Sequence, residues 1–290
     1  MTTEDKRKSS CTGGGCAKGA ASGASKYQDE HIAQSLSKIR HKLIVMSGKG
    51  GVGKSSVSAG LAVQLAVTGH TVGLLDVDIH GPSLAGIMGV QGLLEITEDK
   101  KVQAKQVHDR LKVVSMQSLM HDADQAVIWR GPAKSGVIRQ FVGDVLWGDL
   151  DFLIIDAPPG TGDEPLSVAQ TIPDANALIV TTAQDVALSD VRKSINFCHT
   201  IRMDIVGLVE NMGPFDCPCC GKPVALFKSG GGEATAARMS VPFLGTLPFD
   251  PEVVKACDNG KAIELASAAP AFMSAVERIA AKVLGSVDHR

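Results

Sequence analysis

The chain is poor in aromatic residues and nearly neutral in charge. Phe, Trp and Tyr together make up 4% of its 290 residues, and the formal net charge is −2. So few aromatic side chains argue against a stacking platform for single-stranded nucleic acid. Near-neutrality gives no support for a strongly basic nucleic-acid surface. We therefore expect no nucleic-acid partner.

Long apolar runs are also lacking. No stretch of about 18 apolar residues occurs, so we expect no transmembrane helix and no membrane partner. The basic start at residues 1–8 is followed by no apolar segment, which argues against a secretory signal, and Glu4 and Asp5 count against a mitochondrial transit peptide. With 44% hydrophobic residues, the chain can build one large or two small packed domains.

Residues 48–56 carry a phosphate-binding pattern. They read Gly-Lys-Gly-Gly-Val-Gly-Lys-Ser-Ser, which fits G-x-x-x-x-G-K-[ST], between an apolar run at 43–46 and a helical pattern at 57–66. Glycines let backbone N–H groups converge on phosphate oxygens, and the helix start adds unpaired N–H groups and the positive end of its dipole. The alternative, a glycine-rich turn that matches by chance, is disfavoured by the flanking strand and helix.

We therefore expect ATP to bind at this loop. Lys54 would reach the terminal phosphates, and the Ser55 hydroxyl would ligate Mg²⁺. The expected contact residues are Gly48, Lys49, Gly50, Gly51, Val52, Gly53, Lys54, Ser55 and Ser56.

Apolar runs alternate with helical patterns along the rest of the chain. We expect strands at 42–47, 71–76, 111–116, 151–156, 176–182, 204–210 and 242–247, and helices at 54–68, 133–146, 163–171, 187–201, 232–239 and 270–284. Strands that are apolar throughout are buried on both faces, as in parallel sheets covered by helices. The prediction is a single α/β domain at 39–288, doubly wound around a mostly parallel sheet with helices on both faces. A flexible tail rich in Gly, Ser and Ala should precede it at 1–38, with a helix starting near Asp29.

Acidic residues follow two of the expected strands. Asp76 ends the strand at 71–76 and Asp78 follows it two residues later, and Asp156 ends the strand at 151–156. Ligands of open α/β sheets bind outside the carboxyl ends of the strands. We expect Asp156 to hold Mg²⁺ through water and the Gly160 N–H to sense a γ-phosphate. The alternative is that these aspartates only cap helices or turns.

The extra lysine in the loop points to a particular group. The segment 49–55, Lys-Gly-Gly-Val-Gly-Lys-Ser, resembles the "deviant Walker A" loop of the MinD/ParA/nitrogenase iron protein superfamily. The resemblance implies a nucleotide-sandwich dimer in which Lys49 reaches the phosphates of the partner subunit. It also implies that Asp78 orients the attacking water. A solvated loop lysine is the alternative for Lys49.

A cysteine cluster stands apart from the nucleotide motifs. Cys217 and Cys220 form a C-x-x-C pair with Cys219 between them, and no second such pair exists among the seven cysteines. An ATP site implies the reducing cytoplasm, where clustered cysteines act as ligands or redox groups. A [4Fe–4S] cluster or a structural Zn²⁺ takes four ligands, which a two-fold homodimer would supply from two copies of the pair.

Taken together, these segments resemble the Mrp/ApbC family of ATPases that bind and transfer iron–sulfur clusters. The resemblance covers about residues 38–285 and rests on the loop at 48–55, the stretches at 76–83 and 156–163, and Cys-Pro-x-Cys after Glu-Asn-Met. It implies a homodimer in which Cys217 and Cys220 bridge a labile [4Fe–4S] cluster that passes from a cluster donor to apo iron–sulfur proteins. It further implies adenine contacts at Asn211, Pro248, Phe249 and Asp250. Hydrolysis should be slow, because no arginine finger or glutamine stands in the matched positions.

Several alternatives remain open at this point. The C-x-x-C pair is also compatible with a dimer-bridging zinc site or a thioredoxin-like redox pair. Cys219 is a bystander or a relay thiol, and Cys11 and Cys16 are a transient ligand pair or metal-free thiols. Cys198 and Cys257 are expected to be small buried hydrophobes. The competing functions are a MinD- or ParA-like positioning ATPase and a nitrogenase-iron-protein-like reductase.

Overall fold

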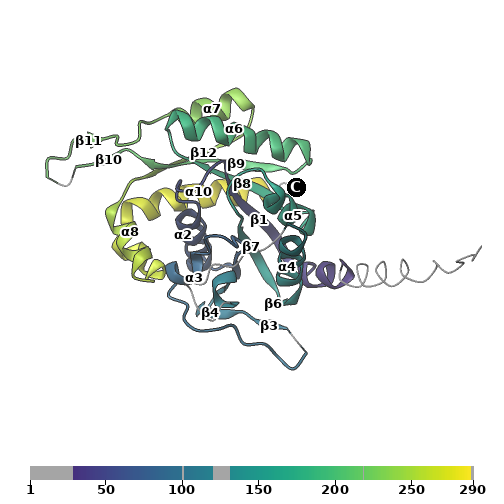
Figure 1. Ribbon diagram of the computed structural model, residues 1–290. Helices are drawn as coiled ribbons and strands as arrows, with labels where there is room; N and C mark the ends of the chain where they lie inside the picture. Colours follow the sequence, from purple (N-terminus) through teal and green to yellow (C-terminus); the bar gives the residue numbers. More distant parts are fainter. Residues whose placement is uncertain (1–28, 100, 120–130, 218, 289–290) are drawn as a thin grey trace, which may run out of the picture.

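An eight-stranded sheet forms the centre of the molecule (Figure 1). The computed structural model describes residues 29–99, 101–119, 131–217 and 219–288. In spatial order the sheet runs β12-β9-β8-β1-β7-β2-β5-β4. All neighbouring strands in it are parallel except the edge pair β4–β5. Its strands are β1 Ile39–Ser47, β2 Val72–Asp76, β4 Lys105–His108, β5 Leu111–Ser115, β7 Leu150–Asp156, β8 Asn176–Thr181, β9 Ile205–Gly213 and β12 Phe243–Pro248.

Helices cover both faces of this sheet, as expected for a doubly wound fold (Figure 1). One face packs against α2 Lys54–Val67, α3 Leu84–Ile87, α8 Pro251–Asp258, α9 Leu265–Ala268 and α10 Pro270–Asp288. The other packs against α4 Gly131–Asp144, α5 Asp163–Thr171, α6 Asp185–Thr200 and α7 Gly231–Met239. The predicted fold class and all seven predicted strands are confirmed.

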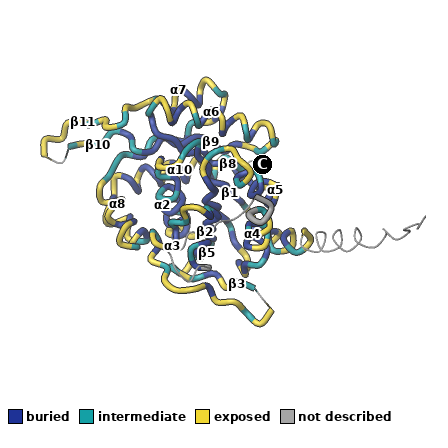
Figure 2. Tube along the Cα trace, viewed as in Figure 1, coloured by how far each residue is buried: buried dark blue, intermediate teal, exposed yellow. Residues whose placement is uncertain are grey.

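The central strands are buried on both faces because each contains a continuous apolar run, such as residues 43–46 in β1 and 152–155 in β7. In β1, Leu43 and Val45 belong to the core on one side of the sheet, and Ile44 and Met46 to the core on the other. Figure 2 shows these strands as a dark, buried centre inside a more exposed ring of helices and loops. An alternating strand would have left one face to solvent. Among the described residues, no helix is both long and apolar enough to cross a membrane.

Residues 29–36 form a further helix, on the segment that was expected to precede the domain. Ile32 and Leu36, each 5% exposed, pack into the core beside α4 and α5. The packed part of the chain therefore extends ahead of the boundary expected at residue 38. Residues 1–28, including Cys11 and Cys16, lie outside the described residues.

Short elements complete the fold. Two pairs of two-residue strands, β3 Val102–Gln103 with β6 Val145–Leu146 and β10 Phe215–Asp216 with β11 Pro223–Val224, form separate small sheets. Two 3₁₀ turns lie at Met116–Leu119 and Ala262–Glu264. The β10–β11 hairpin extends away from the body of the domain (Figure 1), and it carries the C-x-x-C cysteines.

Candidate functional site

The phosphate loop lies at the carboxyl end of β1, between the strand and α2. Gly51 and Gly53 adopt positive φ angles of 78° and 79°, which favour glycine. Added Cβ atoms at Gly50 and Gly51 would meet no atom within 4 Å, so the loop is uncrowded at these two exposed positions. At Gly48 a Cβ would come within 2.3 Å of the backbone of Asp190, in the second turn of α6. The loop is thus uncrowded at Gly50 and Gly51 and tightly packed where it leaves the strand.

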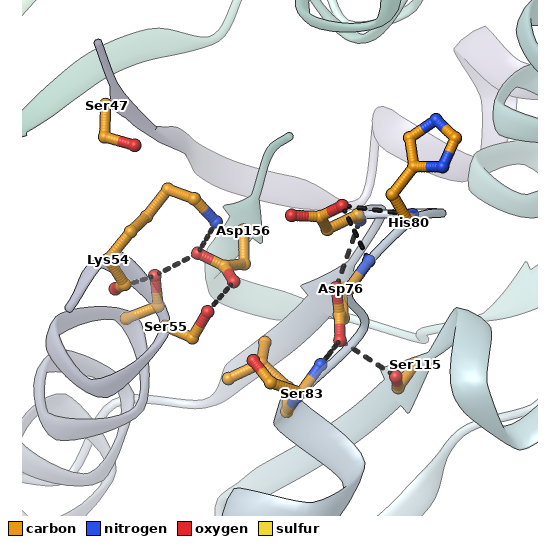
Figure 3. A network of polar contacts seen from close by, with 12 residues as sticks. Ser47, Lys54, Ser55, Asp76, His80, Ser83, Ser115 and Asp156 are labelled. Atoms are coloured by element: carbon orange, nitrogen blue, oxygen red, sulfur yellow. Dashed lines mark hydrogen bonds and ion pairs between the residues drawn. The ribbon is translucent and has the colours of Figure 1, made fainter. Parts of the chain in front are cut away.

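Asp156 is the centre of a buried polar network (Figure 3). Its Oδ1 lies 2.8 Å from Lys54 Nζ, and its side chain is 1% exposed. Ser55 Oγ donates to Asp156 Oδ2 at 2.6 Å, and Ser58 Oγ donates to Oδ1 at 2.9 Å. A hydroxyl and a carboxylate so placed are the oxygen ligands that Mg²⁺ takes in phosphate sites, directly or through water. The residues present therefore fit the predicted ion.

Asp76 lies next to Asp156 on the neighbouring strand, because the register pairs the two positions. Asp76 Oδ2 accepts hydrogen bonds from Ser83 N, Leu84 N and Ser115 Oγ at 2.9–3.0 Å. Burial, and then the negative charge of Asp156, raise the pKa of Asp76 to about 7, although the hydrogen bonds oppose this shift. Asp76 thus holds the segment that follows β2 in place beside the phosphate loop (Figure 3).

Asp78 and Gly160 both make local contacts in this structure. Asp78 Oδ1 accepts from His80 N and Gly81 N at 3.2 Å, which is the turn-capping arrangement considered as an alternative. The Gly160 N–H donates to the Ser47 carbonyl at 2.8 Å, so contact with a γ-phosphate requires that bond to break. The roles predicted for Asp78 and Gly160 therefore remain predictions.

The residues expected to contact adenine fall into two places. Asn211 is 6% exposed and its Nδ2 donates to the Val52 carbonyl of the phosphate loop at 2.9 Å. Pro248, Phe249 and Asp250 line a separate cavity of about 470 Å³, which Phe215 and Asp216 close from the side of the hairpin. This volume lies in the range of small-molecule sites, which are mostly apolar and aromatic. Asp250 also caps α8 by accepting from Glu252 N at 2.9 Å.

The C-x-x-C pair is on the tight turn that joins β10 to β11. Cys217 N donates to the Lys222 carbonyl, and Gly221 N donates to the Cys217 carbonyl at 2.8 Å. Cys217 is half-buried, and Cys219 and Cys220 are exposed. The N–H groups of Cys219 and then Cys220 point to the Cys217 sulfur and lower the pKa of its thiol. A thiol with a lowered pKa more readily supplies the thiolate that metals bind.

One copy of the hairpin does not complete a four-ligand site. Within the described part of the chain, no group of three or more His, Cys, Asp or Glu side chains is placed to hold a metal ion. Cys198 and Cys257 differ from the hairpin cysteines because both are buried. Cys198 packs beside Met46, and Cys257 packs beside Ser56. The expectation that these two are small buried hydrophobes is confirmed.

A ParA family model described as a NUBPL iron-transfer P-loop NTPase matches residues 38–284. The chain belongs to this family. Its relatives include the "Iron-sulfur cluster carrier protein" of Methanocaldococcus jannaschii, which is 45% identical over 264 residues, 90% of this chain and 91% of the relative. The "Cytosolic Fe-S cluster assembly factor NUBP2 homolog" of Trichoplax adhaerens is 42% identical over 264 residues, 87% of this chain and 97% of the relative.

Solved structures agree with this family membership. A nucleotide-binding protein from Archaeoglobus fulgidus, in complex with ADP, superposes with a TM-score of 0.72 at 38% identity over 81% of this chain and 93% of that chain. The cell division ATPase MinD of Pyrococcus furiosus superposes with a TM-score of 0.63 at 23% identity over 84% of this chain and 98% of that chain, and it supports the fold alone. The resemblance drawn from the motifs is therefore confirmed at the level of the family.

Some residues of the site were not predicted from the sequence. Glu210 is fully buried and accepts from Gly230 N and Gly232 N, at the start of α7. Phe215 and Phe227 both lie against Phe249, although they are separated by many residues of chain. An acid that follows an apolar run was a usable signal for Glu210, after residues 205–209, as it was for Asp156. Nothing local in the sequence pairs the three phenylalanines.

Proposed function

We propose that the protein is an ATP-hydrolysing iron–sulfur cluster carrier. It binds a labile [4Fe–4S] cluster as cargo through Cys217 and Cys220 of two copies of the chain and transfers it to apoproteins in the cytoplasm. The observation that carries the proposal is an exposed C-x-x-C hairpin, with a thiol of lowered pKa, on a domain that also holds a complete phosphate loop. The names of relatives that are more than 40% identical support the same cargo.

Each residue of the phosphate site has a proposed part in hydrolysis. Lys54 leaves Asp156 for the terminal phosphates, and Lys49 reaches the phosphates bound by the other copy. Ser55 and Asp156 would hold Mg²⁺, which would supply charge compensation for the phosphates. Asp78 orients the attacking water once its turn opens, and the Gly160 N–H exchanges the Ser47 carbonyl for the γ-phosphate.

The dimer follows from the count of ligands. A single hairpin presents Cys217, Cys219 and Cys220, and the described residues offer no further group of metal ligands beside them. Two hairpins related by a two-fold axis supply four thiolates from Cys217 and Cys220, the number that a [4Fe–4S] cluster takes. Lys49 in trans and the shared cluster would both hold the two copies together.

Anaerobic reconstitution with iron and sulfide tests the proposal. We expect about four irons per dimer in the wild type, their loss in Cys217→Ala/Cys220→Ala, and their retention in the matched variant Cys219→Ala. Transfer to an apo iron–sulfur protein, followed by its regained activity, tests the carrier role. A protein that takes up only zinc, or a double variant that still holds a transferable cluster, would contradict the proposal.

A further inference from the structure

The hairpin that carries the cysteines is attached to the domain chiefly by side-chain packing. The described hydrogen bonds of residues 215–224 join one part of the hairpin to another. They pair β10 with β11 and cross the turn between these two strands. Two paired residues on each strand make a sheet that is too small to be stable alone. The position of the thiols therefore depends on what holds the base of the hairpin.

Phe249 contacts both ends of the segment that contains the hairpin. Its ring centroid lies 5.5 Å from that of Phe215, on the outgoing strand, and 6.3 Å from that of Phe227, on the returning chain. The rings are tilted by 52° and 58°, within the range of favourable aromatic contacts. Phe249 is itself fixed, because its N–H donates to the Gly213 carbonyl at 3.0 Å, at the end of β9.

Phe249 and Phe215 also line one cavity together. This space of about 470 Å³ is also lined by Pro248 and Asp250, which with Phe249 are the residues of the β12 end that were predicted to contact adenine. A planar base entering this cavity touches the loop after β12 and the base of the hairpin together. Its binding removes apolar ring surface from water on both sides and so restrains the hairpin relative to the domain.

We infer that Phe249, with Phe215 and Phe227, positions the cysteine hairpin in response to the nucleobase. The coupling runs through the base and the aromatic cluster, and the phosphates alone do not provide it. The inference rests on the proposed nucleotide site and deepens the proposed function, because it names how nucleotide occupancy reaches Cys217 and Cys220. Coupling of this kind is reciprocal, so an ordered hairpin also favours the bound nucleotide.

The test uses the metal-free full-length protein and measures the alkylation rate of Cys217 by mass spectrometry. ADP at saturation is compared with pyrophosphate at saturation, since pyrophosphate occupies the phosphate loop without a base. Neither has a γ-phosphate, and sedimentation checks that the oligomeric state is the same in both samples. We expect ADP to slow alkylation on the order of fivefold and pyrophosphate by less than about twofold.

Variants then assign the effect to the cluster of rings. Phe215→Leu and Phe227→Leu, each measured at its own saturating ADP concentration, should reduce the protection to less than about twofold. Phe197→Leu makes the same change at a half-buried position on α6, away from the hairpin, and should retain full protection. Thermal unfolding confirms that each variant is folded, and the two hairpin variants provide independent tests if one of them is not.

Three results would overturn the inference: no protection by ADP, equal protection by pyrophosphate, or full protection in both hairpin variants. Because no iron is present, these results are independent of the reconstitution experiment. A protein that fails to bind a cluster can still show base-dependent protection, and a cluster carrier can lack it. The failure of the inference and the failure of the proposed function are thus distinguishable.

Discussion

Lys54 Nζ lies 2.8 Å from Asp156 Oδ1, and the two side chains are only 7% and 1% exposed. Ser58 Oγ donates to the same oxygen, and Ser55 Oγ donates to the other oxygen of this carboxylate. A buried charge that keeps its partner and its hydrogen bonds is tolerated, whereas an unpaired one is costly. This contact therefore fixes the Lys54 side chain beside Asp156, at the start of α2.

The Asp156→Ala variant should be strongly destabilised, because it leaves the Lys54 ammonium buried without its partner. We expect a loss of about 3–5 kcal/mol in the free energy of unfolding, measured in urea. Glu264→Ala breaks the exposed Lys261–Glu264 pair instead and should cost less than about 1 kcal/mol. Equal losses in the two variants would show that the Lys54–Asp156 contact has no special role in stability.

The phosphate loop offers a matched pair of glycine substitutions. A Cβ at Gly48 would lie 2.3 Å from the backbone of Asp190, which has no freedom to move aside, whereas a Cβ at Gly50 meets nothing within 4 Å. Gly48→Ala should therefore lower stability by about 1–3 kcal/mol and weaken ADP binding, and Gly50→Ala should leave the melting temperature unchanged. Calorimetry and titration with ADP measure both effects. A Gly48→Ala protein as stable as Gly50→Ala would contradict this packing.

The sheet was predictable because its strands are apolar at nearly every position, and each ends at a turn or an acid. The weaker elements were not. The antiparallel edge strand β4 and the hairpin strands β10 and β11 contain polar and exposed residues, so they carry no comparable signal. The short helix α8 was missed although Asp250 and Pro251 form a recognisable start, an N-cap followed by proline at the first position.

The candidate site was predictable in its motifs and not in its contacts. The pattern at 48–55 and the acids after β2 and β7 indicated which residues meet at the edge of the sheet. Two contacts depend on how distant segments pack. Asp76 accepts from the N–H groups of Ser83 and Leu84, and Phe215 and Phe249 line one cavity. The residue pattern within one segment does not predict a contact with another segment, so these contacts are seen only in the folded structure.

Lys49 provides a direct test of the proposed hydrolysis. We expect Lys49→Ala to lower kcat for ATP hydrolysis about a hundredfold, because it removes a cationic group from the transition state. ADP binding to one copy should be unchanged, since Lys54 and the loop backbone remain. Lys261→Ala, an exposed lysine that pairs with Glu264, serves as the control and should retain activity. A Lys49→Ala enzyme with full kcat would exclude the role in trans.

The cysteines should separate into two classes when the native protein is alkylated. Burial raises the pKa of Cys198 to about 12 and also raises the pKa of Cys257. At pH 8 only about one Cys198 thiol in ten thousand would be ionised, whereas hydrogen bonds lower the pKa of Cys217. Iodoacetamide should therefore label the hairpin cysteines at pH 8 and spare Cys198. Cys198 is also 0% exposed, so its labelling requires the fold to open, and rapid labelling at pH 8 would contradict its burial.

Glu210 anchors the chain that returns from the cysteine hairpin. Its carboxylate is fully buried and accepts from Gly230 N at 3.1 Å and Gly232 N at 2.6 Å, where the start of α7 also favours negative charge. Glu210→Gln keeps the shape but turns an amide toward one of these N–H groups. We expect a loss of about 1–3 kcal/mol in the free energy of unfolding, because a buried donor then lacks an acceptor.

The same substitution should also loosen the position of the hairpin, since Gly230 ends the segment that carries Cys217 and Cys220. We expect a reconstituted cluster to be lost to a chelator faster from Glu210→Gln than from the wild type. Glu233→Gln changes an exposed acid in the first turn of α7 and should affect neither measurement. If Glu210→Gln loses stability but retains the cluster at the wild-type rate, the carboxylate supports α7 without restraining the thiols. If Glu210→Gln matches Glu233→Gln both in its rate of cluster loss and in its free energy of unfolding, the contacts to Gly230 N and Gly232 N do not help to hold the chain that returns from the hairpin.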